Sequence, residues 1–398
     1  MSLTTRLWEI VDDVIRTTTI VPLNSYNGNI RLATTTFIYT ILDIIISYVI
    51  NFSVIIFGIG TNICNIYIYA NLGLKDTVSI SFLALSASDL CLLTLALVSR
   101  INAFLTYLAV QSPVNLFQLG YLIVWYFQMM LDISTFTTTF IAVQRCLCVA
   151  LPFQVRALFT RNRTVGCIVC VYASVFSCYV PMFSKQFLAW RVDPYTNITV
   201  YVIYYAEGRD GVLAFADVTC RIVFRIVPEI IVIACLVVLI SNLRASVAFR
   251  QKSLSDARGK KHIRAKSSPK LQKNYKQGSS NSTEAATEIT SIKPEGTRDS
   301  DQVPSNRKEK QAVLVVTLTS IIFITTNTPS IFLGFTRRFL PGFNLYQKYH
   351  DIFYLSYNLN NSLQFINATI NFFVYFKYNS KFRGTVSSRF RILPSCEM

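Results

Sequence analysis

Seven apolar segments, each long enough to cross a lipid bilayer, constrain this chain more than any other feature. A helix needs about 20 apolar residues to cross a hydrocarbon core about 30 Å thick. Only 15% of the residues are charged, well below the share usual in soluble proteins. We therefore predict an all-α membrane protein, a seven-transmembrane helix bundle with spans at residues 41–69, 79–99, 119–147, 164–184, 213–243, 311–336 and 349–376.

The distribution of Lys and Arg gives the orientation of the bundle. The stretch from Arg244 to Lys310 holds 16 Lys or Arg against 7 Asp or Glu. Basic loops stay on the cytoplasmic side, so the N-terminus is predicted outside and the C-terminus inside. A basic cytoplasmic loop also explains the excess charge without a nucleic-acid partner. A glycosylation sequon begins at Asn197, in the predicted external loop 185–212.

We predict five regions along the chain. Residues 250–309 are rich in Ser, Lys, Thr, Asn and Gln and are expected to be disordered, because they cannot bury enough apolar surface to fold. The regions are an extracellular N-terminus (1–40), transmembrane helices 1–5 with their loops (41–249), the disordered basic third intracellular loop (250–309), transmembrane helices 6–7 (310–376), and an amphipathic helix with a cytoplasmic tail (377–398).

The sequence offers no group of residues suited to catalysis. Its histidines, His262 and His350, are too few and too far apart for a zinc site. We find no phosphate-binding loop and no nucleophile with a base, so we expect no enzyme and no cofactor. The last apolar segment has no lysine for a retinal Schiff base, which argues against a light sensor. A transporter is a more distant alternative, because the halves show no convincing repeat.

Polar side chains inside the spans indicate a buried functional site. Asp89 lies in the second span, and an ionisable group in a membrane is costly unless it has a function. Carboxylate, hydroxyl and amide oxygens suit a small hard cation. We therefore predict a sodium ion at Asp89, within a polar core of Asn62, Asp89, Ser134, Asn367 and Asn371.

These residues, with others at the membrane boundaries, resemble the rhodopsin-like (class A) G-protein-coupled receptor family through all seven spans. The resemblance is carried by Asn62, Asp89, Gln144-Arg145-Cys146, Pro228, Pro329, the series Asn-Phe-Phe-Val-Tyr from Asn371 to Tyr375, and Phe382. The segments GLKDTVSISFLALSASDL and INFFVYFKYNSKFR are more narrowly similar to gastropod chemosensory receptors and orphan peptide receptors.

The resemblance implies a multi-pass plasma-membrane receptor that binds an extracellular ligand and activates a heterotrimeric G protein, with arrestin as a further cytoplasmic partner. It assigns coupling and switching to Arg145, Glu309, Pro329 and Tyr375. In this family an acid 20 residues before the sixth-span proline often pairs with the arginine, so Glu309 is expected to pair with Arg145. A solvated charge within a basic run is the alternative for Glu309.

Four departures from the family pattern carry expectations of their own. Gly120 occupies the position of the usual third-span cysteine, and 185–212 contains no cysteine, so the usual extracellular disulfide is expected to be absent. Gln144 replaces the acid before Arg145, which removes a local counter-ion. Asn327 replaces the aromatic toggle residue two positions before Pro329. Phe372 replaces the seventh-span proline.

Positive charge in the outer halves of the spans points to an acidic ligand. Arg100 ends the second span, while Arg221 and Arg225 lie one helical turn apart in the fifth. Guanidinium groups bind carboxylates in a fork, which predicts an acidic small molecule or a peptide. Internal pairing is the alternative, with Asp132 or Glu229 neutralising an arginine.

Further candidates for the ligand site are polar or aromatic residues of the third and seventh spans, namely Trp125, Gln128, Tyr354 and Asn358. Phe127 occupies the position at which aminergic receptors have an aspartate, which argues against a monoamine ligand. Chemosensory signalling is the favoured role, and a neuropeptide receptor in neurons is the alternative.

Overall fold

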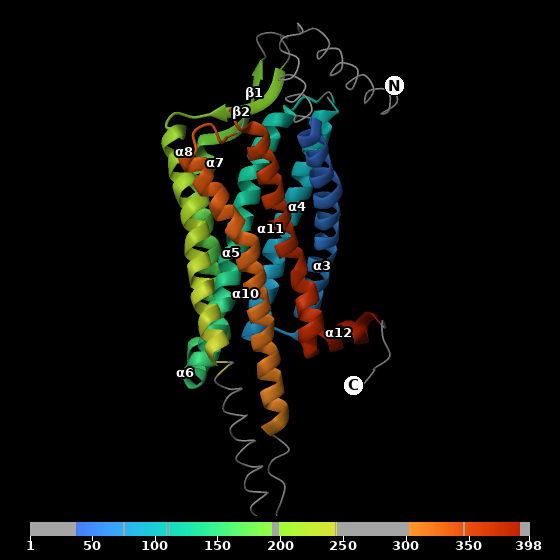
Figure 1. Ribbon diagram of the computed structural model, residues 1–398, viewed down its shortest axis with the longest axis vertical. Helices are drawn as coiled ribbons and strands as arrows, with labels where there is room; N and C mark the ends of the chain where they lie inside the picture. Colours follow the sequence, from blue (N-terminus) through green and yellow to red (C-terminus); the bar gives the residue numbers. More distant parts are fainter. Residues whose placement is uncertain are drawn as a thin grey trace, which may run out of the picture.

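The chain folds into a bundle of helical spans that run side by side (Figure 1). The computed structural model describes residues 37–74, 76–108, 110, 112–192, 199–242, 244, 302–344 and 347–390. The spans within them are Phe37–Leu72, which includes η2 (Ile45–Ile50) and α3 (Asn51–Leu72), then α4 (Thr77–Tyr107), α5 (Leu116–Ala150), α7 (Arg161–Lys185), the fifth span Arg209–Asn242, which includes α8 (Arg209–Val218) and η3 (Thr219–Val223), α10 (Gln302–Phe339) and α11 (His350–Tyr378).

Five of the seven predicted apolar segments lie within one of these spans, and the other two, 213–243 and 349–376, extend one residue beyond Arg209–Asn242 and α11. Six of the described helices are long and apolar enough to cross a membrane by length and composition. The seventh, α11, is not among them, because it buries a series of polar side chains that includes Asn358, Asn361, Gln364 and Asn371. Its polarity faces the interior of the bundle, so it belongs to the bundle even though its average composition is less apolar.

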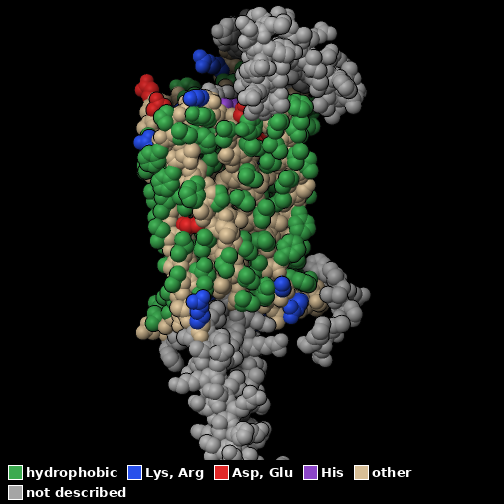
Figure 2. Space-filling model, viewed as in Figure 1, with side chains coloured by type: hydrophobic (Ala, Val, Ile, Leu, Met, Phe, Trp, Pro, Cys, Tyr) green, Lys and Arg blue, Asp and Glu red, His purple; other side chains and the backbone are tan. Residues whose placement is uncertain are grey.

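Outward-facing side chains of the bundle are mainly apolar. Figure 2 shows hydrophobic side chains covering the length of the molecule, with Lys and Arg gathered towards its two ends. Large apolar residues such as Phe57, Val169 and Ile230 are more than half exposed. A surface of this kind requires lipid around it, because a soluble protein rarely exposes such a large apolar area.

A β-hairpin covers one end of the bundle, where the sequence predicted only a loop (Figure 1). Strands β1 (Gln186–Val192) and β2 (Thr199–Tyr205) pair antiparallel, and the ring centroids of Trp190 and Tyr201 lie 4.8 Å apart. The run of β-branched and aromatic residues in β2 is the signal that favours a strand. Asn197, the predicted glycosylation site, lies outside the described residues.

Hydrogen bonds attach this hairpin to α5. The Gln118 side chain accepts from the Ile203 N–H at 2.7 Å, and the Asn115 N–H donates to the Tyr201 carbonyl at 3.1 Å. All nine cysteines within the described residues are free thiols. This agrees with the expectation that the usual extracellular disulfide is absent.

At the opposite end, α10 extends beyond the other spans, and two short helices, α6 (Pro152–Leu158) and α12 (Ser380–Phe390), lie beside the bundle (Figure 1). Helix α10 begins at Gln302, so the predicted disordered loop 250–309 was wrong for its last eight residues. The reason is the run of Arg, Lys, Glu, Gln and Ala after Asn306, which are good helix formers. The rest of that loop lies outside the described residues.

Helix α12 forms where an amphipathic helix was predicted after the last span. Its Phe382 is fully buried and packs against Tyr375 of α11, with 5.9 Å between ring centroids. Tyr69 of α3 packs on the same Phe382 ring at 5.3 Å. These contacts fix α12 to the end of α3 and α11.

Candidate functional site

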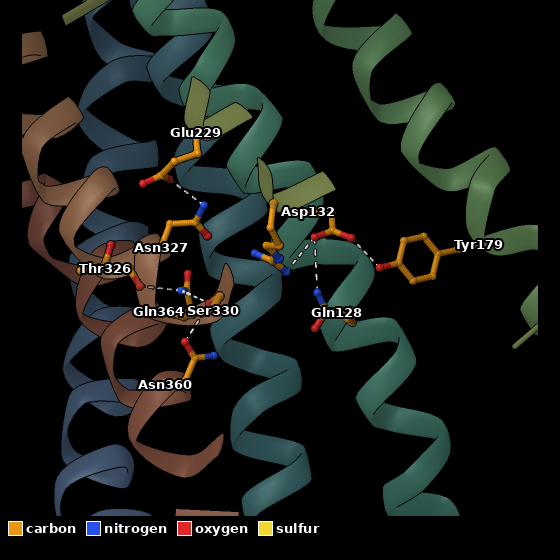
Figure 3. Close-up of polar contacts among 10 residues, drawn as sticks. Gln128, Asp132, Tyr179, Glu229, Thr326, Asn327, Ser330, Asn360 and Gln364 are labelled. Atoms are coloured by element: carbon orange, nitrogen blue, oxygen red, sulfur yellow. Dashed lines mark hydrogen bonds and ion pairs between the residues drawn. The ribbon is translucent and has the colours of Figure 1, made fainter. Parts of the chain in front are cut away.

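A buried ion pair joins the third and fifth spans in the middle of the bundle. Arg225 Nη2 lies 2.7 Å from Asp132 Oδ1, and both side chains are almost completely buried. Tyr179 of α7 donates to the other carboxylate oxygen at 2.5 Å, and Gln128 donates to Oδ1 at 3.3 Å (Figure 3). Because a buried charge is tolerated only when it is paired and hydrogen-bonded, this network holds α5, α7 and the fifth span in register.

Glu229 binds the sixth span and not an arginine, so its expected neutralising role was wrong. One carboxylate oxygen accepts from Asn327 Nδ2 at 2.9 Å and the other from Thr328 Oγ1 at 2.8 Å. The side chain points from the fifth span towards Asn327 of α10 (Figure 3). Asn327, which replaces the aromatic toggle, is therefore one half of a clasp between two spans.

The other side of α10 is hydrogen-bonded to α11 close to Pro329. Gln364 Nε2 donates to the Thr326 carbonyl at 2.9 Å and to Ser330 Oγ at 3.0 Å. Ser330 in turn donates to Asn360 Oδ1 at 2.7 Å (Figure 3). Proline interrupts the helical hydrogen-bond ladder, and polar side chains from neighbouring helices compensate at such points in a membrane. The weakest segment of α10 is thus held from both sides.

A cavity of about 360 Å³ lies between α5, the fifth span, α10 and α11. Its walls combine apolar and aromatic side chains with three arginines. The lining residues are Tyr121, Val124, Trp125, Gln128, Leu131, Arg221, Arg225, Ser330, Leu333, Gly334, Arg337, Asn344, Phe353, Tyr354, Tyr357, Asn360 and Asn361. A concave, largely apolar site with a few convergent polar groups is the usual form of a small-molecule site.

The structure brings most of the predicted ligand residues together at this cavity. Trp125, Gln128, Arg221, Arg225 and Tyr354 line it. Arg221 lies 3.1 Å from Asp217 and stacks over the Trp125 ring at 5.2 Å. Arg225 is paired with Asp132, which confirms the alternative of internal pairing for that arginine.

Arg100 and Asn358, also predicted to bind ligand, lie elsewhere. Arg100 Nη2 donates to Asn358 Oδ1 at 3.2 Å, and Asn358 Nδ2 donates to Asp43 Oδ1 at 2.6 Å. The two residues therefore tie together the first, second and seventh spans and are not part of the cavity wall.

Arg337 is a cavity residue that sequence reasoning missed. It lies beside Arg338 in the last turn of α10. Its guanidinium lies over the Phe353 ring, 5.9 Å from the centroid. Its position eight residues after Pro329, on the same outer half of α10 as Leu333, is the signal that could have indicated it.

The predicted polar core forms only in part around Asp89. Ser134 Oγ donates to Asp89 Oδ1 at 2.5 Å, and Asn371 Nδ2 donates to Oδ2 at 3.1 Å. Asn62 instead donates to the carbonyls of Gly58 and Ala368, both at 2.9 Å, and its own Oδ1 is buried without a described donor. Asn367 makes no described hydrogen bond to this carboxylate, so the core consists of Asp89, Ser134 and Asn371, with Asn62 beside α11.

The cytoplasmic end of the bundle is closed by aromatic packing. Tyr375 is fully buried, and its ring centroid lies 4.6 Å from that of Phe82 and 5.6 Å from that of Tyr69. Arg145 is half-buried nearby on α5, with its Nε unpaired among the described residues. The preceding Gln144 accepts from Ser81 of α4 at 3.2 Å, so it binds a neighbouring helix. The side chain of Glu309 lies outside the described residues, and its pairing with Arg145 stays a prediction.

Fold and site together define a membrane receptor of seven helical spans, with a ligand-sized cavity near one end and a closed helix interface at the other. The chain belongs to the rhodopsin family of seven-transmembrane receptors, whose family model matches residues 61–375. A search of curated proteins found no significant match. Members of this family are receptors and not enzymes, and they signal through G proteins. Family membership and the long apolar helices together make the chain a multi-pass plasma-membrane protein.

Proposed function

We propose that this receptor binds an acidic small molecule from outside the cell and activates a heterotrimeric G protein in response. The observation that carries the proposal is the cavity wall, in which Arg221, Arg225 and Arg337 come together while no lining residue is acidic. Guanidinium groups in a partly dry cavity favour a carboxylate over a neutral or cationic group.

The size of the cavity supports a small molecule. A volume of about 360 Å³ lies at the small end of the range of about 300–1,000 Å³ that is usual for ligand sites. A small external acid suits a chemosensory receptor, which is the role we favour. A neuropeptide receptor is the alternative, and its ligand would insert only a terminal carboxylate and the residue that carries it.

The position of α10 supports a route from cavity to cytoplasm. Helix α10 carries Arg337 at the cavity and Asn327 at the clasp with Glu229. A ligand that binds Arg337 therefore acts on the same helix that the clasp restrains. It shifts a pre-existing equilibrium towards a state in which α10 leaves the fifth span and exposes Arg145 and Tyr375 to the G protein or to arrestin.

A sodium ion at Asp89 is part of the proposal. The residues present fit such an ion, because Asp89 supplies a carboxylate, Ser134 a hydroxyl oxygen, and Asn62 an amide oxygen that is buried without a described donor. The ion would supply a positive charge against the buried carboxylate. Asp89, Ser134 and Asn371 join the second, third and seventh spans through their own hydrogen bonds.

Nucleotide exchange on a co-expressed G protein tests the proposal. Cells expressing the chain are screened with organic acids, amino acids and short peptides, beside an Arg145→Ala variant at equal surface level. We expect a response to acids that the variant loses. Responses of equal size from both forms would contradict the role of Arg145, and a response to amines alone would contradict an acidic ligand.

A further inference from the structure

We propose that the ligand carries a single negative charge on an otherwise apolar body, and that Arg337 is the residue that selects it. This inference rests on the proposed function, since it names the class of acid that the cavity accepts. It separates an amphiphilic monocarboxylate from dicarboxylates, zwitterions and neutral molecules of the same size.

The charges around the cavity give the first argument. Two of the three lining arginines are already paired, Arg225 with Asp132 at 2.7 Å and Arg221 with Asp217 at 3.1 Å. Arg337 forms no ion pair with any carboxylate among the residues that the structure describes. Among the described residues at this cavity, three positive charges stand against two negative ones, so a ligand with one carboxylate neutralises them.

Unpaired donors in the cavity wall give the second argument. The Trp125 indole N–H is buried and has no acceptor within the described part of the chain. Arg225 Nη1 is also buried and also lacks an acceptor there. Both side chains are at least nine-tenths buried and line the cavity. Buried donors without acceptors are costly, and a ligand with carboxylate oxygens supplies the acceptors that they lack.

The remaining walls give the third argument. Apart from the arginines and the amide and hydroxyl side chains of the wall, the cavity is lined by apolar and aromatic residues, including Val124, Leu131, Leu333, Phe353 and Tyr357. A second carboxylate placed against these residues would lose its hydration without gaining a hydrogen-bond partner. The free energy lost in this way makes binding of a dianion unfavourable. An ammonium group would meet the arginines and be repelled. Apolar walls of this kind select against dianions, and the arginines select against amines.

Four matched probes compare a single acid with a neutral, a dianionic and a cationic analogue: 3-phenylpropionate, its neutral amide 3-phenylpropanamide, the dianion phenylsuccinate and the cation 3-phenylpropylamine. The full-length receptor, purified in detergent, is heated with each probe, because a ligand that binds only the folded state raises the midpoint of thermal unfolding. The variants are Arg337→Gln and, as the matched control, Arg338→Gln, whose side chain is exposed next to it.

We expect 3-phenylpropionate alone to raise the midpoint, and the apparent dissociation constant to rise by about tenfold or more in Arg337→Gln, the effect of losing one charge-assisted contact. Arg338→Gln should bind as the wild type does. Equal stabilisation by the amide or by phenylsuccinate, or an unchanged affinity in Arg337→Gln, would overturn the inference. Stabilisation by none of the four probes would overturn it as well.

Failure of this inference is distinguishable from failure of the proposed function. Signalling through a G protein is tested by nucleotide exchange with Arg145→Ala as the control, and that comparison does not depend on Arg337. A receptor that responds to dicarboxylates through Arg145 would keep the proposed function while contradicting a monoanionic ligand.

Discussion

Glu229 of the fifth span accepts a hydrogen bond from Asn327 of α10, with 2.9 Å between the carboxylate oxygen and the amide nitrogen. The carboxylate is buried and has no ion-pair partner among the described residues, so it depends on Asn327 and Thr328 of the sixth span. Charged groups inside a membrane that bind a neighbouring helix usually mark a functional contact.

Breaking this clasp should raise basal signalling. In Glu229→Leu both hydrogen bonds between the two spans are lost, which destabilises the closed state of the receptor by about 1–3 kcal/mol. The population of the open state should therefore rise by about fivefold or more. Basal nucleotide exchange per surface receptor measures the effect. Thr325→Ala is the control, because Thr325 bonds only to carbonyls of its own helix. Basal exchange at or below the wild-type level would contradict the clasp.

Removing Asp132 should destabilise the receptor strongly. Asp132→Ala leaves the buried Arg225 guanidinium unpaired, at a cost of about 3–5 kcal/mol. The measurement is the thermal midpoint of purified protein, with surface expression as a second readout. The double variant with Asp132→Leu and Arg225→Met should recover most of the loss, because no buried charge remains. Asp210→Ala is the control, since that carboxylate is fully exposed. A double variant as unstable as the single one would argue against charge burial as the cause.

Arg100→Gln should leave ligand potency unchanged. Arg100 donates to Asn358 and does not line the cavity, so its loss weakens contacts between spans by about 1 kcal/mol. Concentration–response curves for an activating acid test this beside Arg337→Gln. If potency fell equally in both variants, Arg100 would belong to the ligand site as the sequence suggested.

A side chain at Gly58 should destabilise the receptor. A Cβ there would collide with Thr369 Oγ1 and lie 2.7 Å from Leu93 Cδ1, at the contact between α3, α4 and α11. Gly58→Ala should therefore cost about 1–3 kcal/mol of stability. In Gly60→Ala, two residues further on, the new methyl group meets no atom within 4 Å, so this variant is the control. Equal thermal midpoints for the two variants would show that the helices can separate at low cost.

Asp89→Asn should remove any dependence of ligand affinity on sodium concentration. The substitution keeps the size of the side chain but removes the charge that the ion would neutralise. Affinity is measured in sodium chloride and in choline chloride at equal ionic strength. Thr94→Ala is the control, because Thr94 lies on the same helix as Asp89, is exposed and donates to the Leu90 carbonyl. A sodium effect that persists in Asp89→Asn would place the ion elsewhere.

Hydropathy and charge predicted the bundle because lipid imposes length and composition on every span. The ends were less accurate, since helices such as α4 and α10 continue past the apolar region into water. The hairpin β1–β2 was missed because a loop between two spans carries no requirement for polarity or length. Its aromatic and β-branched residues were the available signal.

The candidate site could be predicted in kind but not in its pairing. An excess of arginine in the outer halves of the spans indicated an acidic ligand. The sequence alone could not show which of these arginines forms an ion pair within the protein. Arg225 is neutralised by Asp132 from another span, and Glu229, one turn away from Arg225, turns to α10 instead. Such choices depend on how the helices are rotated about their axes. Arg337 lines the cavity because α10 continues for ten residues after Pro329.

The hairpin over the cavity end is joined to α5 by hydrogen bonds at Ile203 and Tyr201, and no cysteine occurs before Cys64 or between residues 185 and 212. Among the described residues, no sulfur bridge holds the outer face of this receptor. A thiol reductant therefore has no bond to break between this hairpin and α5, and hydrogen bonds alone set how firmly the hairpin is attached.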